Sequence, residues 1–369
     1  MNKAGLIILF FFIVATSIAQ SYKVDFGSNK WKVLGDAQIE QQNGETITTV
    51  GKGIGFGYLD DFNFTNGTIE CDLYAEASRA YVGLTFRIAT PNDFECIYFQ
   101  PHTSGKWDAV QYDPIFNQSA TWQLYNGKGF QTKASIPTKK WFHVKIEVKD
   151  FVAKVFLNHN IECVMETPLQ HTHQTGYIGI FSYHAARFKN LKIKKYNSFS
   201  LMQPKNSALP NKPNTIPHWK VSSPYNGYGQ NEDIKHLHAK VQKWHDIKPK
   251  FNSLVNLNRY FSKTNSQNTV IAKTTINSTK QQIKQLAFGY SDKIRIFLNG
   301  TEIFKGDNSY YESASYDDRG YVLPNHKSID LPLQQGSNEL ILEISEDKFG
   351  WGFITLLSNF DHISFPGNK

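Results

Sequence analysis

Two acidic residues, Glu70 and Asp72, lie two positions apart in a segment that alternates apolar and polar side chains. Successive side chains of a β-strand point to opposite faces, so both carboxylates are expected on one face. Paired carboxyl groups can act as nucleophile and acid/base at a glycosidic bond, which makes Glu70 and Asp72 catalytic candidates. The alternative is the solvent-facing side of a half-buried strand, with Ile69, Cys71 and Leu73 inside.

A denser run of polar and aromatic residues lies between positions 87 and 112. Arg and His can bind a carboxylate or sulfate, aromatic rings can stack on a sugar, and Asp or Gln can bond hydroxyl groups. Much of the run is expected in a loop, where binding groups concentrate; the alternative is a structural loop whose polar groups bond the backbone. The candidate substrate-binding residues are Arg87, Gln100, His102, Trp107, Asp108, Gln111 and Tyr112, and His102 is also a candidate acid/base.

The sequence offers few candidate metal ligands. His171 and His173 would share a face of an extended segment, but the sequence places no third ligand, and structural zinc sites usually have four. Surface histidines in a loop are the alternative. Residues 316–319 could form a calcium-lined or a sugar-binding loop, although calcium takes six to eight oxygen ligands and only two carboxylates are evident here. We therefore expect no cofactor, and we keep calcium binding at this turn as an alternative.

Short strands must position these side chains. Alternating segments with no long helical pattern between them predict a β-sandwich over residues 20–197. Lys149 and Asp150 separate two of these segments and predict a hairpin turn. The alternating segments are 68–74, 81–87, 94–99, 141–148, 151–157, 176–181 and 188–193.

The chain changes character at residues 198–217, which are rich in proline and asparagine and predict a linker. A more helical or irregular patch is expected around residues 234–238, and strand patterns then return within residues 218–369. Asn299-Gly300 between two apolar runs predicts a two-residue hairpin. The predicted fold class is all-β, with two tandem β-sandwich (jelly-roll) domains.

The charge balance bears on the partner. The 369 residues include 40 Lys and Arg against 32 Asp and Glu, a net charge of +8. A basic surface can attract anionic polysaccharide, nucleic acid or anionic lipid. The basic residues are dispersed and no nucleic-acid motif is present, so we expect no nucleic-acid partner. Aromatic residues make up 14% of the chain, which suits both sandwich cores and sugar-stacking surfaces.

Residues 1–19 have the organisation of a secretory signal peptide: Lys3, an apolar run, then Ser17 and Ala19 before the expected cut. An uncleaved anchor is the alternative, but the run is shorter than the about 20 residues that span a bilayer. We expect a secreted or periplasmic protein with no membrane span after cleavage. Three cysteines, at positions 71, 96 and 163, form no disulfide framework, although one disulfide is left open.

The first domain resembles the concanavalin A-like lectin/glucanase superfamily, including laminin-G-like and DUF1080-type modules. The resemblance rests on residues 67–72, 82–87, 98–112, 122–125 and 141–145, and covers about residues 30 to 195. The second domain looks like a galactose-binding-like jelly roll, through residues 296–300, 333–340 and 350–353. The Glu-x-Asp-x-x-x-Glu spacing of residues 70–76 departs from laminarinase-type catalytic motifs, and Tyr74 stands where a third carboxylate would be needed.

These folds imply an exported protein that recognises polysaccharide or oligosaccharide, anionic polysaccharide included. The same fold hosts lectins, hydrolases, lyases and adhesion modules, so it does not fix the function. A glycoside hydrolase or polysaccharide lyase acting through the first domain is one alternative. A module that binds another protein is the other.

Overall fold

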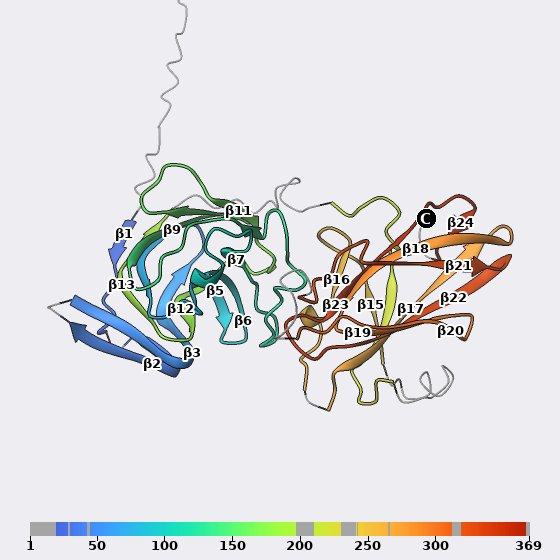
Figure 1. The fold of residues 1–369 in the computed structure, drawn as a ribbon, viewed down its shortest axis with the longest axis horizontal. Coiled ribbons are helices and arrows are strands. Elements are labelled where there is room, and N and C mark those ends of the chain that lie inside the picture. Colours follow the sequence, from blue (N-terminus) through green and yellow to red (C-terminus); the bar gives the residue numbers. More distant parts are fainter. Residues whose placement is uncertain are drawn as a thin grey trace, which may run out of the picture.

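The structure is a computed structural model that describes residues 20–28, 30–42, 45–196, 210–229, 241, 243–264, 266–311 and 319–366. The predicted signal peptide, the irregular patch at 234–238, most of the linker and residues 316–318 lie outside these ranges. The described residues form two β-sandwiches side by side along the long axis of the molecule (Figure 1). This confirms the predicted fold class. In the described part of the chain no helix is long and apolar enough to cross a membrane.

The first sandwich is one continuous antiparallel sheet folded over on itself, with strand order β11-β10-β9-β4-β13-β3-β12-β5-β6-β7-β8. The long strand β3 joins the two layers: Thr48–Val50 pairs with β13, whereas Ile54–Phe64 pairs with β12. A short 3-10 helix η1 (Pro101–Thr103) follows β6. The strands are β1 (Gln20–Lys23), β2 (Trp31–Gln42), β3 (Glu45–Phe64), β4 (Gly67–Ala75), β5 (Tyr81–Thr90), β6 (Asp93–Phe99), β7 (Val110–Tyr112), β8 (Gln131–Thr132), β9 (Trp141–Lys149), β10 (Val152–Leu157), β11 (Met165–Pro168), β12 (Gly176–Tyr183) and β13 (Ala186–Lys195).

Alternation along the strands builds the core of this sandwich. Ile69, Cys71 and Leu73 of β4 are fully buried, and they face Leu84 and Phe86 of β5 across the shared apolar core. Glu70 and Asp72 are on the opposite, outward face of β4, as their spacing predicted. Burial of such side chains stabilises a fold by about 1.5–3 kcal/mol each.

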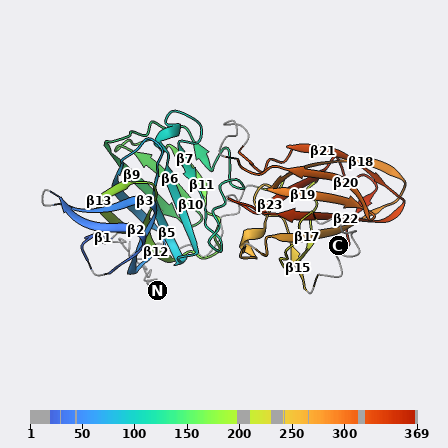
Figure 2. The same ribbon diagram turned by 60° about the horizontal axis from the view of Figure 1, so that its bottom comes forward.

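The second sandwich has two sheets, with strand orders β15-β14-β17-β22-β19-β20 and β16-β23-β18-β21. Figure 2 shows the strands of both sheets running alongside one another. Their inner faces share a core that includes Trp219, Trp351 and Phe353. The strands are β14 (Trp219–Ser222), β15 (Trp244–Ile247), β16 (Leu254–Asn256), β17 (Thr269–Ser278), β18 (Gln282–Ser291), β19 (Lys293–Leu298), β20 (Thr301–Asp307), β21 (Lys327–Leu333), β22 (Gly336–Ser345), β23 (Gly352–Leu357) and β24 (Ile363–Ser364).

Both predicted hairpins form. Asn299 and Gly300 join β19 to β20 with φ angles of 50° and 85°, which is the turn that an Asn-Gly pair favours. Val152 pairs with Lys149, so the turn between β9 and β10 consists of Asp150 and Phe151, one residue later than predicted. All three cysteines are free, and Cys71 and Cys96 are buried, so the disulfide that the sequence left open does not form.

The two sandwiches meet through apolar and polar contacts. Leu254, Val322 and Ile354 of the second domain belong to the same buried cluster as Leu124 of the first. The side chain of Gln123 donates to the Arg319 carbonyl (2.9 Å) and accepts from the Ser291 hydroxyl (2.9 Å). These contacts hold the loop before β8 against the second sandwich.

Candidate functional site

The candidate binding loop, residues 100–109, is held rigidly by its own hydrogen bonds. The side chain of Gln100 donates to the Asp108 carbonyl at 2.7 Å, and the Gln100 amide donates to the Ala109 carbonyl at 2.9 Å. Pro101 starts helix η1, where its fixed φ and missing N–H are tolerated. The loop therefore presents His102, Trp107 and Asp108 at fixed positions beside the second domain.

Six residues from both domains gather at this junction, and we call them the junction cluster: Tyr81, His102, Trp107, Asp108, Arg319 and Tyr321. Arg319 Nη1 donates to Asp108 Oδ2 at 3.1 Å. Asp108 is 1% exposed and the Arg319 side chain 22%, so water screens this ion pair poorly. A pair of this kind is strongly destabilised when one partner is removed, because a buried charge is left alone.

Aromatic rings surround the ion pair. The ring centroids of Trp107 and Tyr321 are 5.6 Å apart, and those of Tyr81 and His102 are 5.0 Å apart in an edge-to-face arrangement. Trp107 is 39% exposed, whereas Tyr321 is buried. An exposed indole braced by a buried phenol gives a ligand a rigid apolar surface at small entropic cost.

The cluster continues into an aromatic surface on the outward side of β3, β12, β5 and β6, which we call the aromatic face. Tyr81 contacts Tyr98 and Tyr183, at centroid distances of 5.7 and 5.8 Å. Phe56 stacks on Phe94 further along the same surface. Most of these rings are buried or half-buried against one another, and Tyr183, 41% exposed, is the accessible ring beside Tyr81. The aromatic face comprises Phe56, Tyr58, Tyr81, Ile88, Phe94, Cys96, Tyr98, Ile115, Tyr177 and Phe181.

The electrostatics favour a neutral imidazole at His102. Burial lowers the pKa of His102, Asp108 opposes that shift, and the charges of Arg319 and Arg79 reinforce it. Nδ1 of His102 is buried without a hydrogen-bond partner. Buried polar atoms normally have a partner, so this nitrogen is an unsatisfied polar atom within the junction cluster. Burial also raises the pKa of Tyr321 to about 12, which keeps its phenol protonated.

Four predicted binding residues are instead occupied inside the protein. Arg87 is fully buried; its Nη2 donates to the Thr65 carbonyl at 2.8 Å, and burial lowers its pKa. Gln100 closes the binding loop. Gln111 donates to the carbonyls of Tyr112 (2.7 Å) and Tyr125 (3.0 Å). These side chains support the site from within and present no surface to a soluble sugar.

The fourth, Tyr112, belongs to a buried chain of hydrogen bonds. Its hydroxyl donates to Glu95 and accepts from the Gln170 amide at 2.8 Å. Burial raises the pKa of Glu95, while the hydrogen bonds from Tyr112 and His171 lower it. Gln170 accepts in turn from Arg259 of the second domain at 2.8 Å. Tyr112 thus links the first core to the domain junction.

The catalytic candidates Glu70 and Asp72 contact one imidazole. His143 Nδ1 lies 2.7 Å from Asp72 Oδ1, and its Nε2 lies 3.5 Å from Glu70 Oε2. Asn190 Nδ2 donates to the other oxygen of Asp72 at 2.8 Å. The imidazole occupies the space between the two carboxylates, where a two-carboxylate mechanism needs the scissile bond. The arrangement can orient a histidine, and it lies on the outward face of the other layer, β4 and β9.

The histidine pair does not make a metal site with the described residues. His171 stacks on Phe116 at 4.0 Å and is 5% exposed, and burial lowers its pKa to about 3. A ring nitrogen of His173 lies 2.8 Å from the Arg87 carbonyl. Within the described ranges no group of three or more His, Cys, Asp or Glu residues could hold a metal ion. The calcium candidate at 316–318 lies outside those ranges.

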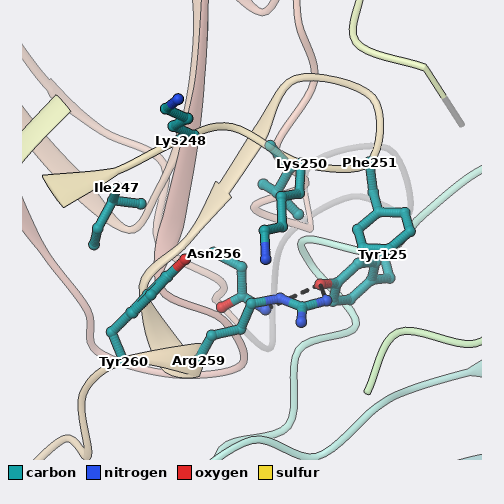
Figure 3. Close-up of a pocket in the computed structure, with 9 residues that line it drawn as sticks. Tyr125, Ile247, Lys248, Lys250, Phe251, Asn256, Arg259 and Tyr260 are labelled. Carbon is teal, nitrogen blue, oxygen red and sulfur yellow. Dashed lines mark hydrogen bonds between the residues drawn. The ribbon is translucent and has the colours of Figure 1, made fainter. Parts of the chain in front are cut away.

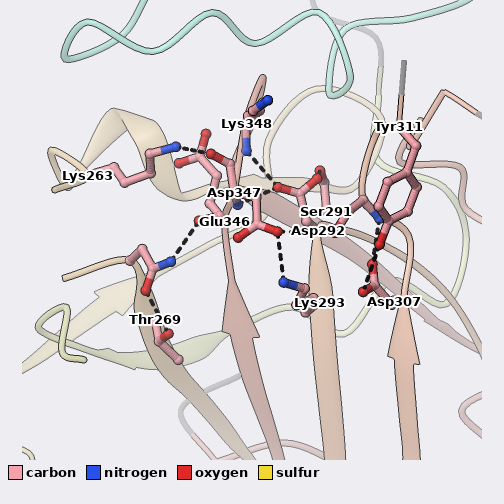
Figure 4. A network of polar contacts seen from close by, with 12 residues as sticks. Lys263, Thr269, Ser291, Asp292, Lys293, Asp307, Tyr311, Glu346, Asp347 and Lys348 are labelled. Atoms are coloured by element: carbon pink, nitrogen blue, oxygen red, sulfur yellow. Dashed lines mark hydrogen bonds and ion pairs between the residues drawn. The ribbon is translucent and has the colours of Figure 1, made fainter. Parts of the chain in front are cut away.

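A carboxylate network in the second domain supports the junction (Figure 4). Asp292 accepts from the Lys348 amide at 2.8 Å, and Glu346 accepts from the Gly350 amide at 3.1 Å. Burial raises the pKa of Asp292 to about 7. These bonds fix the loop that places Phe349 5.2 Å from Trp122 of the first domain. The buried carboxylates of this network therefore serve to hold the loop that contacts the first domain.

Sequence reasoning did not single out Tyr81 and Tyr321 of the junction cluster. Tyr81 begins a strand whose pattern gives no sign that the ring is at a site. Arg319 and Tyr321 lie more than 200 positions after the binding loop, and only the polar turn at 316–319 drew attention to that segment. No local periodicity can bring such distant residues together, since their contact depends on domain packing.

A comparison with family models finds a similarity over the first domain. A family model described as "3-keto-alpha-glucoside-1,2-lyase-like domain" matches residues 23–194. This confirms the DUF1080-type resemblance over that region, which is less than half of the chain. No curated protein matches the chain.

Solved structures match about half of this chain at low identity. The carbohydrate-binding module CBM66 from Bacillus subtilis is 18% identical, with 45% of this chain and 96% of that chain covered and a TM-score of 0.37. A putative glycosyl hydrolase from Parabacteroides distasonis is 16% identical (46% and 89% covered, TM-score 0.34). A Bacillus licheniformis beta-glucanase is 10% identical (49% and 99% covered, TM-score 0.35). Likenesses at this level transfer neither residues nor activity.

Proposed function

We propose that this is an exported, secreted or periplasmic protein that recognises a polysaccharide or oligosaccharide at the junction cluster and the adjoining aromatic face. The observation that carries the proposal is the exposed indole of Trp107, 39% exposed and packed against Tyr321, on the same rigid loop as the Asp108–Arg319 ion pair between the domains. Rigid aromatic groups with a few fixed polar groups are the usual composition of a small-ligand site.

A sugar ring can use both kinds of group at once. Its apolar face would lie on the indole of Trp107, and a ring hydroxyl would bond His102 Nδ1. The neutral imidazole can donate or accept at that atom, depending on its tautomer. Tyr81 and Tyr183 would extend the contact along the aromatic face to further sugar units. The second sandwich, galactose-binding-like in this proposal, contributes Tyr321 and Arg319.

The test is binding of the mature protein to neutral, uronate and sulfated polysaccharides, measured by calorimetry. Trp107→Ala should weaken binding by at least tenfold, because buried aromatic anchors dominate recognition energy. Phe360→Ala is the matched control, since Phe360 is an exposed aromatic residue (37%) outside the cluster. Binding to no polysaccharide, or binding that survives Trp107→Ala, contradicts the proposal.

A second candidate is a lyase or hydrolase acting through the first domain. It is favoured by the family description, which names a lyase acting on 3-keto-α-glucosides, and by the neutral state that burial gives His102. Elimination from such a sugar needs a base to take the proton beside the carbonyl. The electron pair then forms a double bond as the group on the next carbon departs with its bonding electrons and is protonated.

Product analysis separates the two candidates. An enzyme should release unsaturated or reducing ends from a glycoside, and His102→Asn should abolish the release while Trp107→Phe retains it. Binding without new chain ends across the panel supports recognition alone.

A further inference from the structure

A small pocket at the back of the domain junction is not part of the junction cluster (Figure 3). Its enclosed space is about 10 Å³, which is the room needed by about one water, and a wider mouth opens to solvent. Tyr125 of the first domain forms one wall. The second domain supplies the others: Ile247, Lys248, Lys250, Phe251, Leu254, Asn256, Arg259 and Tyr260.

Three cations line this pocket without a carboxylate among its walls. Arg259 donates to three neutral oxygens: the Tyr125 hydroxyl (3.1 Å), the Gln170 carbonyl (2.8 Å) and Gln170 Oε1 (3.2 Å). Its guanidinium lies over the rings of Phe116 (4.5 Å) and Phe251 (5.5 Å). No bond or ion pair of the Lys250 ammonium is found among the described residues. Figure 3 shows this ammonium pointing toward Arg259 and Tyr125, whereas Lys248 points away.

The pocket also has an acceptor without a donor. Asn256 is 4% exposed; its Nδ2 donates to the Tyr125 hydroxyl at 3.1 Å, and its Oδ1 is buried without a partner. A buried oxygen without a partner is destabilising, and a hydroxyl donor from a ligand would offset this cost. Tyr260, 40% exposed, forms the rim with its ring available to an apolar surface.

We propose that this pocket binds an acidic sugar unit. We place the carboxylate of a uronic acid at the open mouth of the pocket, beside Lys250 and Arg259, because charge-assisted bonds to a guanidinium and an ammonium are the strongest available there. A neighbouring hydroxyl donates to Asn256 Oδ1, and the ring lies against Tyr260. The inference rests on the proposed function because it takes the ligand to be a glycan. It adds the substrate class, which is a glycan that contains uronic acid.

The probe is a galacturonate oligosaccharide, compared by calorimetry with a neutral galactose oligosaccharide of the same length and with inorganic sulfate. Lys250→Gln should weaken uronate binding about tenfold and reduce its dependence on salt concentration. Lys305→Gln, which removes an exposed lysine of β20 outside the pocket, should leave both unchanged. Tyr260→Ala should weaken the uronate, and neither pocket variant should alter affinity for the neutral oligosaccharide.

Two results overturn the inference. Uronate affinity that is equal in the wild type and in Lys250→Gln shows that the pocket does not hold the carboxylate. Sulfate that binds as tightly as the uronate and with the same Lys250 dependence shows a site for a free anion. If Trp107→Ala abolishes glycan binding while Lys250→Gln has no effect, the proposed function survives and this inference fails. If Lys250→Gln weakens uronate binding while Trp107→Ala has no effect, this inference survives and the proposed glycan site at the junction cluster fails.

Discussion

Removing the charge of Arg319 should destabilise the domain junction. Asp108 is 1% exposed and its Oδ2 lies 3.1 Å from Arg319 Nη1, so Arg319→Met leaves a buried carboxylate without its cation. Loss of one partner from a buried pair costs about 3–5 kcal/mol. The Arg319 side chain is 22% exposed, which allows some water to reach Asp108, so we expect about 3 kcal/mol.

Urea unfolding of the wild type, Arg319→Met, Asp108→Asn and the double variant measures this. The double variant should recover part of the loss, since it buries no charge, and the difference gives the coupling between the two residues. Lys30→Met is the control, because Lys30 and Asp61 pair with side chains 58% and 50% exposed, and such pairs contribute about 0–1 kcal/mol. If Arg319→Met is no less stable than Lys30→Met, the ion pair does not hold the junction.

Three further predictions concern the first domain. Burial raises the pKa of Asp113 from 3.8 to about 7, so the protonated side chain should contribute about 3 kcal/mol of stability that is lost as pH rises from 4 to 7; Asp113→Asn should remove this contribution from the pH dependence in urea titrations at each pH, and an unchanged pH dependence would contradict it. Gly179→Ala should lose about 1–3 kcal/mol in the same assay, because the new Cβ would lie 2.3 Å from the Gly57 carbonyl oxygen; wild-type stability would show that β12 can shift. Burial raises the pKa of the Cys71 and Cys96 thiols well above 9, so mass spectrometry after iodoacetamide treatment should find native protein modified only at exposed Cys163; modification of all three would mean that the core opens.

Local sequence patterns predicted the strands that alternate and the turns that have a strong signal. The segment of β4 shows why: from Ile69 to Ala75 its buried and outward residues follow the sequence alternation. Asn299-Gly300 formed the expected turn because few other dipeptides adopt two positive φ angles readily. The long hairpin of β2 and β3 was not predicted, since its residues mix Gly, Thr and charged side chains without clear alternation.

Arg87 shows where alternation fails. Its polar type suggested a surface position at the end of a strand. However, the register of β5 shifts between Phe86 and Thr90, and Arg87 adopts a φ of 49°, which is uncommon for a residue other than glycine. The side chain is buried and bonds Thr65 and Asn66. A bulge of this kind redirects a side chain without leaving a signal in the residue pattern.

The junction cluster depends on contacts that no single-domain reasoning could supply. Asp108 and Arg319 are 211 residues apart in the chain, yet they form a largely buried ion pair within the cluster. Arg319 and Tyr321 both come from the second sandwich, so the chemistry around the exposed indole belongs to the two-domain protein. Residues 23–194 alone would present His102, Trp107 and Asp108 without these partners. We therefore expect ligand preference to follow the second domain as much as the first, and substitutions at Tyr321 to change which glycan binds as well as how tightly.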